Sequence, residues 1–220
     1  LKALRTLGVK IVKRKNHYSV YGNGLNSFKI KRKLTRLYCG NSLTTGRLLT
    51  GLLSTIPSKF YIYGDASANR RDFMRVIEPL EKVGAQFFPR KKTLPLTIEG
   101  TSLPLAQKHV ETRGSSQVKG LILLSALSTP GITTVEELKS KSSRTHTEIF
   151  LKKIGCDIKF KQTKKSNLIY LRGQKNLYSF NYSVKSDPSS AAYLICLSLL
   201  TPGSKLTLPG IICNETRIGF

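Results

Sequence analysis

No apolar run in this 220-residue chain reaches the roughly 20 residues that a membrane-spanning helix needs. The longest runs cover residues 121–127 and 191–200, and the hydrophobic fraction of 40% is ordinary. These features argue against a membrane partner and favour a soluble α/β protein. The first residues already belong to a repeated segment, with no initiator methionine and no signal peptide. We therefore expect part of a longer, cytoplasmic protein.

Cysteine and histidine are scarce and scattered. The four cysteines include no C-x-x-C pair, and the three histidines form no metal-ligand pattern with them. Three of the cysteines lie in or beside apolar stretches, where a free thiol packs as a small hydrophobe. We expect buried free thiols and no metal site. The residues are Cys39, Cys156, Cys196 and Cys213, and His17, His109 and His146.

Acidic residues are few, 12 against 37 lysines and arginines, so the net charge is +25. Such a charge is typical of nucleic-acid binding. However, the basic residues cluster mostly in connections between expected strands, and no nucleic-acid fold signature is present. A lysine-rich solvated surface and the attraction of small anionic substrates both remain open. The clusters are residues 10–15, 29–36, 90–92 and 161–165.

An internal repeat is the most informative feature that is present. A helix-like segment leads into Gly8, Gly84 and Gly155, which lie 76 and 71 residues apart. Two strand-like runs follow each of these glycines, and the second run ends at another glycine. Those second glycines are Gly22, Gly100 and Gly173.

Each copy continues with a small-residue turn, an apolar helix and a further β-rich run. The expected helices cover residues 43–53, 118–127 and 191–200, and the expected strands cover residues 59–63, 132–135 and 205–208. The unit reads helix, strand, strand, helix, strand. An α/β (α+β) fold made of repeated units is therefore predicted.

The turn at residues 114–120 is the best candidate site. Ser115 and Ser116 open an apolar helix whose first amides have no intrahelical partner, so the turn can hold a phosphate. Gln117 and Lys119 add donors within the same turn. The alternative is that Ser115 only caps its helix.

Equivalent turns occur in the other copies. Asn41 and Arg47 flank the first one, as ligand groups or as parts of a plain turn. At residue 187, Asp-Pro is a helix-start signature, for which we favour a structural role.

Two helix entries also carry candidate residues. Arg70 and Arg71 enter one helix where its dipole disfavours cations, which favours an anion-binding role. In the matching entry of the next copy, Thr145 and Glu148 form a predicted capping box. Ser143 and Arg144 are left as candidates beside it.

Taken together, these segments resemble the enolpyruvyl transferase family, and within it the branch that acts on shikimate 3-phosphate. The match runs in family order along nearly the whole chain and covers about the middle half of a family member. It rests on residues 37–42 with Thr44, Arg47 and Leu48, on residues 75–80, 115–119, 143–144 and 146–148, on Asp187 with residues 189–192, and on Asn214, Thr216 and Arg217.

The resemblance implies a fold of βαβαββ-type units, three to a lobe, with two lobes closing on the substrates. It places an incomplete first lobe at residues 1–185 and the start of a second lobe at residues 186–220. The family's other branch, which acts on UDP-N-acetylglucosamine, typically has a reactive cysteine before the phosphoenolpyruvate arginine. Residues 66–70 contain none.

The implied reaction moves the carboxyvinyl group of phosphoenolpyruvate to the 5-hydroxyl of shikimate 3-phosphate, releases phosphate and needs no cofactor. The enzyme is expected to be a monomer. Its acid and base groups are expected outside this chain, so the chain alone should be inactive. The resemblance assigns Ser115, Ser116, Gln117, Ser143 and Arg144 to shikimate 3-phosphate, and Arg71, Gln117, Leu43 and Asn41 to phosphoenolpyruvate.

Three positions depart from the family pattern. Leu43 replaces a glycine at the wall of the phosphoenolpyruvate pocket, and Gly46 replaces a methionine. We expect Leu43 to narrow the pocket and to exclude glyphosate, a bulkier analogue, at some loss of substrate affinity. Asp72 replaces a proline beside Arg71, and we expect its carboxylate to compete for that guanidinium.

Overall fold

A computed structural model of the chain describes residues 1–212 and 214, and it contains the predicted repeat as two complete βαβαββ units. The first unit has a short extra helix, α3 (Ala66–Arg70), after its second strand. Its other elements are β3 (Leu34–Tyr38), α2 (Leu43–Leu53), β4 (Lys59–Tyr63), α4 (Met74–Val83), β5 (Gln86–Phe88) and β6 (Leu96–Glu99). The second unit consists of β7 (Lys108–Glu111), α5 (Ser116–Ala126), β8 (Ile132–Leu138), α6 (His146–Lys153), β9 (Asp157–Gln162) and β10 (Ser166–Arg172), with a 3-10 turn, η1 (Lys139–Lys141), before α6.

The two units share one sheet topology. Their strand orders are β3-β4-β6-β5 and β7-β8-β10-β9, and in each sheet the first two strands are parallel while the other pairs are antiparallel. A parallel pair needs a crossover, which α2 and α5 provide. Before the first unit, α1 (Lys2–Thr6) and the hairpin of β1 (Lys10–Lys13) and β2 (Tyr18–Tyr21) form the closing part of another unit.

Close backbone contacts explain two of the repeated glycines. A Cβ on Gly100 would lie 2.1 Å from the carbonyl oxygen of Ile56, and a Cβ on Gly173 would lie 2.0 Å from that of Thr129. The last strand of each unit therefore packs directly on the turn that ends the crossover helix. Gly22 has no such neighbour within 4 Å, so this contact is a feature of the two complete units.

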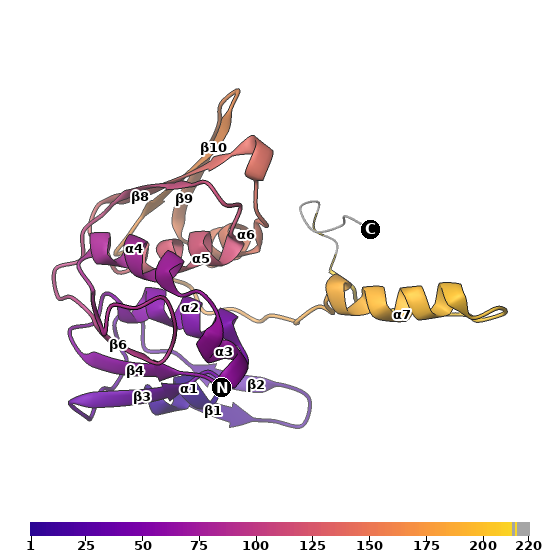
Figure 1. Ribbon diagram of the computed structural model, residues 1–220, viewed down its shortest axis with the longest axis horizontal. Coiled ribbons are helices and arrows are strands. Elements are labelled where there is room, and N and C mark those ends of the chain that lie inside the picture. Colours follow the sequence, from indigo (N-terminus) through magenta and orange to yellow (C-terminus); the bar gives the residue numbers. More distant parts are fainter. Residues whose placement is uncertain (213, 215–220) are drawn as a thin grey trace.

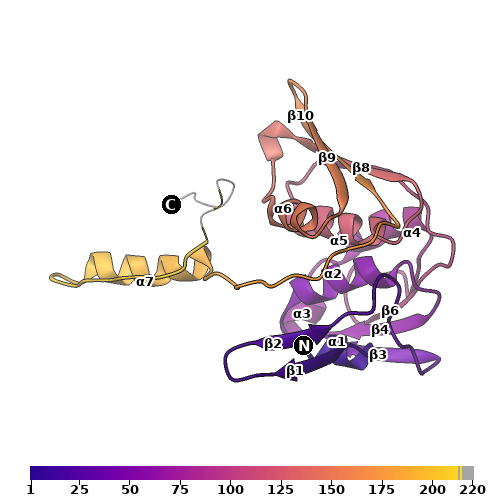
Figure 2. The ribbon, with the colours of Figure 1, turned by 180° about the vertical axis from the view of Figure 1, so that it is seen from behind.

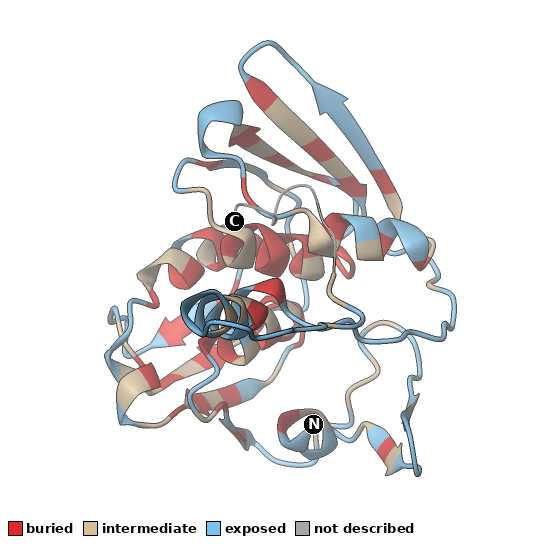
Figure 3. Ribbon diagram, turned by 90° about the vertical axis from the view of Figure 1, so that its right-hand side faces the viewer, coloured by how far each residue is buried: buried red, intermediate tan, exposed pale blue. Residues whose placement is uncertain are grey.

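Helices α2, α4, α5 and α6 lie between the two sheets (Figures 1 and 2). Helices α2 and α4 pack against the β3-β4-β6-β5 sheet, and α5 and α6 pack against the β7-β8-β10-β9 sheet. The residues between the sheets are the buried ones, and α5 is buried on nearly every side (Figure 3). Helices α2 and α5 touch at Gly51, where a Cβ would lie 2.4 Å from the carbonyl oxygen of Leu121.

The last described segment lies apart from these layers. An extended stretch leads to α7 (Pro188–Leu200), which projects away from the rest of the molecule (Figure 1). Asp187 caps α7 as predicted, since its side chain accepts a hydrogen bond from Ser189 N at 3.1 Å. The strand expected at residues 205–208 is wrong, because these residues have no regular structure; the bridge in this region joins Ser186 to Ile211.

The cysteine prediction is correct at two positions. Cys39 and Cys156 are free and buried, and burial raises the pKa of each thiol to about 11. Cys196 is exposed on α7, so the expectation of burial is wrong for this thiol within the described chain. Cys213, Thr216 and Arg217 lie outside the described residues. No helix among residues 1–212 and 214 is both long enough and apolar enough to cross a membrane.

Candidate functional site

Four loops at the carboxyl ends of the parallel strands carry the candidate residues. In the first unit, the amide of Asp65, after β4, donates to the carbonyl oxygen of Gly40, after β3, at 3.0 Å. In the second unit, a Cβ on Gly114, after β7, would lie 2.8 Å from the carbonyl oxygen of Lys141, after β8. The loops of each unit are thus in direct contact. This end of a parallel strand pair is where α/β folds bind ligands.

The starts of α2 and α5 face this site. Ser42 and Ser115 are the N-cap residues, and their hydroxyls accept from Thr45 N at 3.2 Å and from Val118 N at 3.3 Å. The capping role considered for Ser115 is therefore confirmed. Gln117 Nε2 donates to Thr44 Oγ1 at 2.7 Å, which holds the two helix starts side by side. Two positive helix ends at one place favour a bound anion.

Arg47 connects the two units at this point. Its Nη1 donates to Gln117 Oε1 at 2.6 Å, and its Nη2 donates to the carbonyl oxygen of Asp72 at 2.7 Å. Burial lowers the pKa of Arg47, as do the nearby charges of Arg75 and Arg71, whereas Asp72 acts in the opposite direction. Several cations thus lie close together, and an anionic ligand would relieve their repulsion. From the sequence, Arg47 could be either a ligand group or part of a plain turn. The signal for a ligand role was its position just after the Gly-Asn-Ser turn.

Arg71 is exposed and is the C-cap residue of α3, with Arg70 in the last turn of that helix. The expectation that these arginines stand at a helix start is therefore wrong, because a helix end favours cations. Arg71 Nη2 donates to Asn41 Oδ1 at 3.2 Å and contacts Ser67 Oγ at 3.5 Å. The expected competition from Asp72 is wrong. The carboxylate of Asp72 instead accepts from Met74 N at 2.7 Å and lies 3.9 Å from Arg75 Nε.

Lys119 does not belong to the donors that face a ligand, so this part of the sequence interpretation is wrong. Its side chain is fully buried, and Nζ lies 2.8 Å from Glu137 Oε2 and 2.6 Å from Glu148 Oε1. The capping box predicted for Thr145 and Glu148 is also wrong. Thr145 occupies the N-cap position of α6 without a side-chain capping bond, and Glu148 faces Lys119 instead.

Ser143 lies in the loop between η1 and α6 and is 6% exposed. Its amide donates to Glu137 Oε1 at 3.1 Å, but its buried hydroxyl makes no hydrogen bond to any described residue. A buried hydroxyl without a partner is costly unless something else binds it. Arg144 beside it is exposed, and Ser116 is half-buried.

Leu43 differs from the other candidates. It is the first residue of α2, and its side chain is 4% exposed and belongs to the hydrophobic core. The structure therefore links polar candidates of the four loops, whereas the Leu43 side chain lies in the hydrophobic core.

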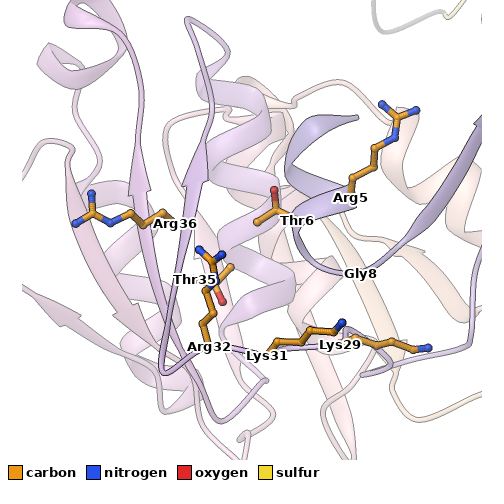
Figure 4. A pocket seen from close by; sticks show the side chains of 8 residues that line it. All are labelled: Arg5, Thr6, Gly8, Lys29, Lys31, Arg32, Thr35 and Arg36. Carbon is orange, nitrogen blue, oxygen red and sulfur yellow. The ribbon is translucent and has the colours of Figure 1, made fainter.

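A basic cavity of about 560 Å³ lies elsewhere, among residues of α1, β3 and the segment before β3. Its lining includes Arg5, Lys29, Lys31, Arg32 and Arg36, but these side chains point in different directions rather than toward one centre (Figure 4). It shares no residue with the four loops. Its cations fit the solvated-surface interpretation of the net charge.

Comparisons with known proteins all give one family. The family model described as EPSP synthase (3-phosphoshikimate 1-carboxyvinyltransferase) matches residues 1–220. Proteins of that name from Ruegeria sp. and Roseobacter denitrificans are 38% and 37% identical to the chain over its whole length. The solved structure of EPSP synthase from Acinetobacter baumannii is 35% identical, superimposes with a TM-score of 0.82 and is matched by 99% of the chain. The chain spans about half of each, 48%.

Proposed function

The chain belongs to the EPSP synthase family, and from this premise we propose that the protein carrying it transfers the carboxyvinyl group of phosphoenolpyruvate to shikimate 3-phosphate. The 5-hydroxyl of shikimate 3-phosphate adds to C2 of phosphoenolpyruvate while C3 takes up a proton. The tetrahedral adduct then loses phosphate and a proton, which leaves the enolpyruvyl ether. Both substrates are anions, so their approach needs fixed cations and hydrogen-bond donors.

One observation carries this proposal. The contacts of Gln117 with Arg47 and Thr44 place the starts of α2 and α5 side by side, with cations around them. We assign Ser115, Ser116, Gln117, Ser143 and Arg144 to shikimate 3-phosphate. We assign Arg71, Asn41, Gln117 and Leu43 to phosphoenolpyruvate. Gln117 belongs to both sets because it stands where the two units meet. The polar residues of the two sets bind and orient the substrates.

Proton transfer is assigned to the remaining half of the enzyme. We propose that residues 1–185 form most of a first lobe and that residues 186–220 begin a second lobe. The composition of α7 supports this division, because it is apolar all round, yet Tyr193, Leu199 and Leu200 are each 81% exposed. Helices of this kind are buried in complete proteins. The chain alone is therefore expected to be inactive, and the complete enzyme to be a cytoplasmic monomer.

Two other functions are less well supported. The branch that acts on UDP-N-acetylglucosamine is not favoured, since the relatives described above carry the shikimate enzyme's name. A nucleic-acid-binding role rests on net charge alone, and the basic cavity does not converge on a ligand.

The test is an assay of the full-length protein. Phosphate release from phosphoenolpyruvate should require shikimate 3-phosphate and should follow saturation in both substrates. Omitting shikimate 3-phosphate is the control for simple hydrolysis. Absence of release at saturating concentrations would overturn the proposal.

A further inference from the structure

A buried charged triad lies beneath the second unit's loops. Lys119 is 0% exposed, and Glu137 and Glu148 are each 1% exposed. The ammonium of Lys119 lies between the two carboxylates, at 2.8 Å from Glu137 and 2.6 Å from Glu148. The three residues come from three different elements, α5, β8 and α6.

Stability is a poor explanation for this triad. Removing three charged groups from water is expensive, and well-packed apolar residues often serve a core as well or better. The charges do not balance, since two carboxylates face one ammonium. Burial raises the pKa of Glu148, against the opposing effect of Lys119, and its Oε2 has no hydrogen-bond partner among residues 1–212 and 214. Charged groups buried at such a cost suggest that the triad positions another part of the chain.

The triad holds the backbone of one residue, Ser143. Glu137 Oε1 accepts the Ser143 amide at 3.1 Å, and Lys119 Nζ lies 3.5 Å from the Ser143 carbonyl oxygen. Both backbone polar groups of Ser143 are thus hydrogen-bonded, while its buried hydroxyl has no partner in the described part of the chain. The main chain is therefore fixed, and the Ser143 hydroxyl is left for a ligand.

We infer that Glu137 and Lys119 are positioning residues for shikimate 3-phosphate, acting through the backbone of Ser143, with Glu148 holding Lys119 in place. This inference rests on the proposed function. Substrate binding needs the Ser143 hydroxyl at a fixed point, and small displacements of such groups are costly. The triad supplies this by tying the loop to α5, whose first turn carries Ser115 and Ser116.

A double-mutant cycle in the full-length protein tests the inference. The variants are Glu137→Gln, Ser143→Ala and the two combined, and the measurement is the Kd of shikimate 3-phosphate by titration calorimetry. Each single change should raise Kd about tenfold, the loss of one hydrogen bond to a charged group. The double variant should be no weaker than Ser143→Ala, because Glu137 acts through Ser143. The KM of phosphoenolpyruvate should change less than threefold.

Glu136→Gln is the matched control. Glu136 is the neighbouring glutamate on β8, but it contacts Lys108 at 3.5 Å and Ser166 Oγ at 2.8 Å. Its replacement should leave Kd unchanged. A fall in affinity as large as that of Glu137→Gln would mean that any loss of charge on β8 weakens binding, and would overturn the inference.

A second variant covers the case in which Glu137→Gln does not fold. Glu148→Gln keeps the contact of Glu137 with the Ser143 amide but loosens the hold on Lys119. It should therefore raise Kd about threefold, less than Glu137→Gln, and the rise should disappear when Ser143→Ala is also present. A rise that persists with Ser143→Ala would contradict the inference. Full additivity of Glu137→Gln and Ser143→Ala would contradict it as well. Wild-type protein that fails to bind shikimate 3-phosphate would overturn the proposed function itself, which is a distinct outcome.

Discussion

Nη1 of Arg47 donates to Oε1 of Gln117 at 2.6 Å, although the two residues lie 70 positions apart in the chain. Arg47 belongs to α2 of the first unit and Gln117 to α5 of the second, at equivalent ends of the crossover helices. The contact orients the amide of Gln117, whose Nε2 donates to Thr44. One guanidinium thus links the starts of the two crossover helices.

Arg47→Lys should weaken substrate binding more than it weakens the fold. A lysine cannot make the forked contact with Gln117 and the Asp72 carbonyl oxygen at once. We expect the KM of phosphoenolpyruvate to rise about tenfold or more, the value of a lost charged hydrogen bond. Arg36→Lys is the control, since Arg36 stacks on Tyr61 away from the site. Equal KM values for the two variants would contradict the role of Arg47.

Arg71→Ala should raise the KM of phosphoenolpyruvate and leave the Kd of shikimate 3-phosphate nearly unchanged. Arg71 donates a hydrogen bond to Asn41 of the first unit, whereas the serines that we assign to shikimate 3-phosphate belong to the second unit. Arg70→Ala is a matched control, because Arg70 Nε donates to the carbonyl oxygen of Ala66 in its own helix. Steady-state kinetics of the full-length protein distinguish the two. A similar loss with Arg70→Ala would point to a general effect of charge.

Gly100→Ala and Gly173→Ala should each destabilise the protein to a similar degree. The added methyl groups would meet carbonyl oxygens at 2.1 and 2.0 Å, so the backbone must shift. We expect a loss of about 1–3 kcal/mol for each, as for other overpacked sites. Gly22→Ala meets nothing within 4 Å and should stay within about 0.5 kcal/mol of wild type. Urea unfolding measures the free energy of unfolding of all three variants. If Gly173→Ala leaves this free energy unchanged, the close contact of Gly173 with Thr129 is wrong.

The repeat and most of its elements could be predicted from the sequence because their signals are local. The expected segments at residues 43–53 and 59–63 coincide with α2 and β4. The strand predicted at residues 205–208 is absent because a β-rich segment becomes a strand only when it pairs with a partner strand. In the described chain, the β-type contact of this region is the single bridge between Ser186 and Ile211.

The candidate site was predictable to a smaller extent. Ser115, Ser143 and Arg71 lie on the loops that the sequence singled out, but the partners of Lys119 could not be foreseen. A lysine in the first turn of a helix suggests a phosphate donor, whereas tertiary packing places this ammonium against Glu137, 18 residues away, and Glu148. No short motif encodes such a pairing, since it depends on how α5 packs against β8 and α6.

Glu111 should make the stability depend on pH. Burial acts to raise the pKa of Glu111, but hydrogen bonds from His109 and from the amides of Arg113 and Ser115 outweigh it, so the pKa is lowered. A lowered pKa stabilises the folded state above the unfolded-state value of about 4.3, and this stability is lost as pH falls through the folded pKa. Glu111→Gln should therefore cost more unfolding free energy at pH 7 than at pH 3.

The control for this prediction is Glu99→Gln, which removes an exposed ion pair with Lys59. Exposed pairs contribute little, so its effect should be small at both pH values. A difference between wild type and Glu111→Gln that does not shrink on acidification would contradict the assigned cause.

Leu43→Gly should increase the sensitivity of the full-length enzyme to glyphosate. Leu43 begins α2, two residues after Asn41, which we assign to phosphoenolpyruvate, and glycine stands at this position in the family pattern. Removing the side chain should lower the inhibition constant of glyphosate about tenfold, which corresponds to 1.4 kcal/mol of binding free energy. Because Leu43 is only 4% exposed, the change should also cost about 2–5 kcal/mol of stability. Leu49→Gly, at a buried leucine of the same helix, separates the two effects, since it should lose similar stability without a change in the inhibition constant. If wild type is already as sensitive as Leu43→Gly, the leucine does not narrow the pocket.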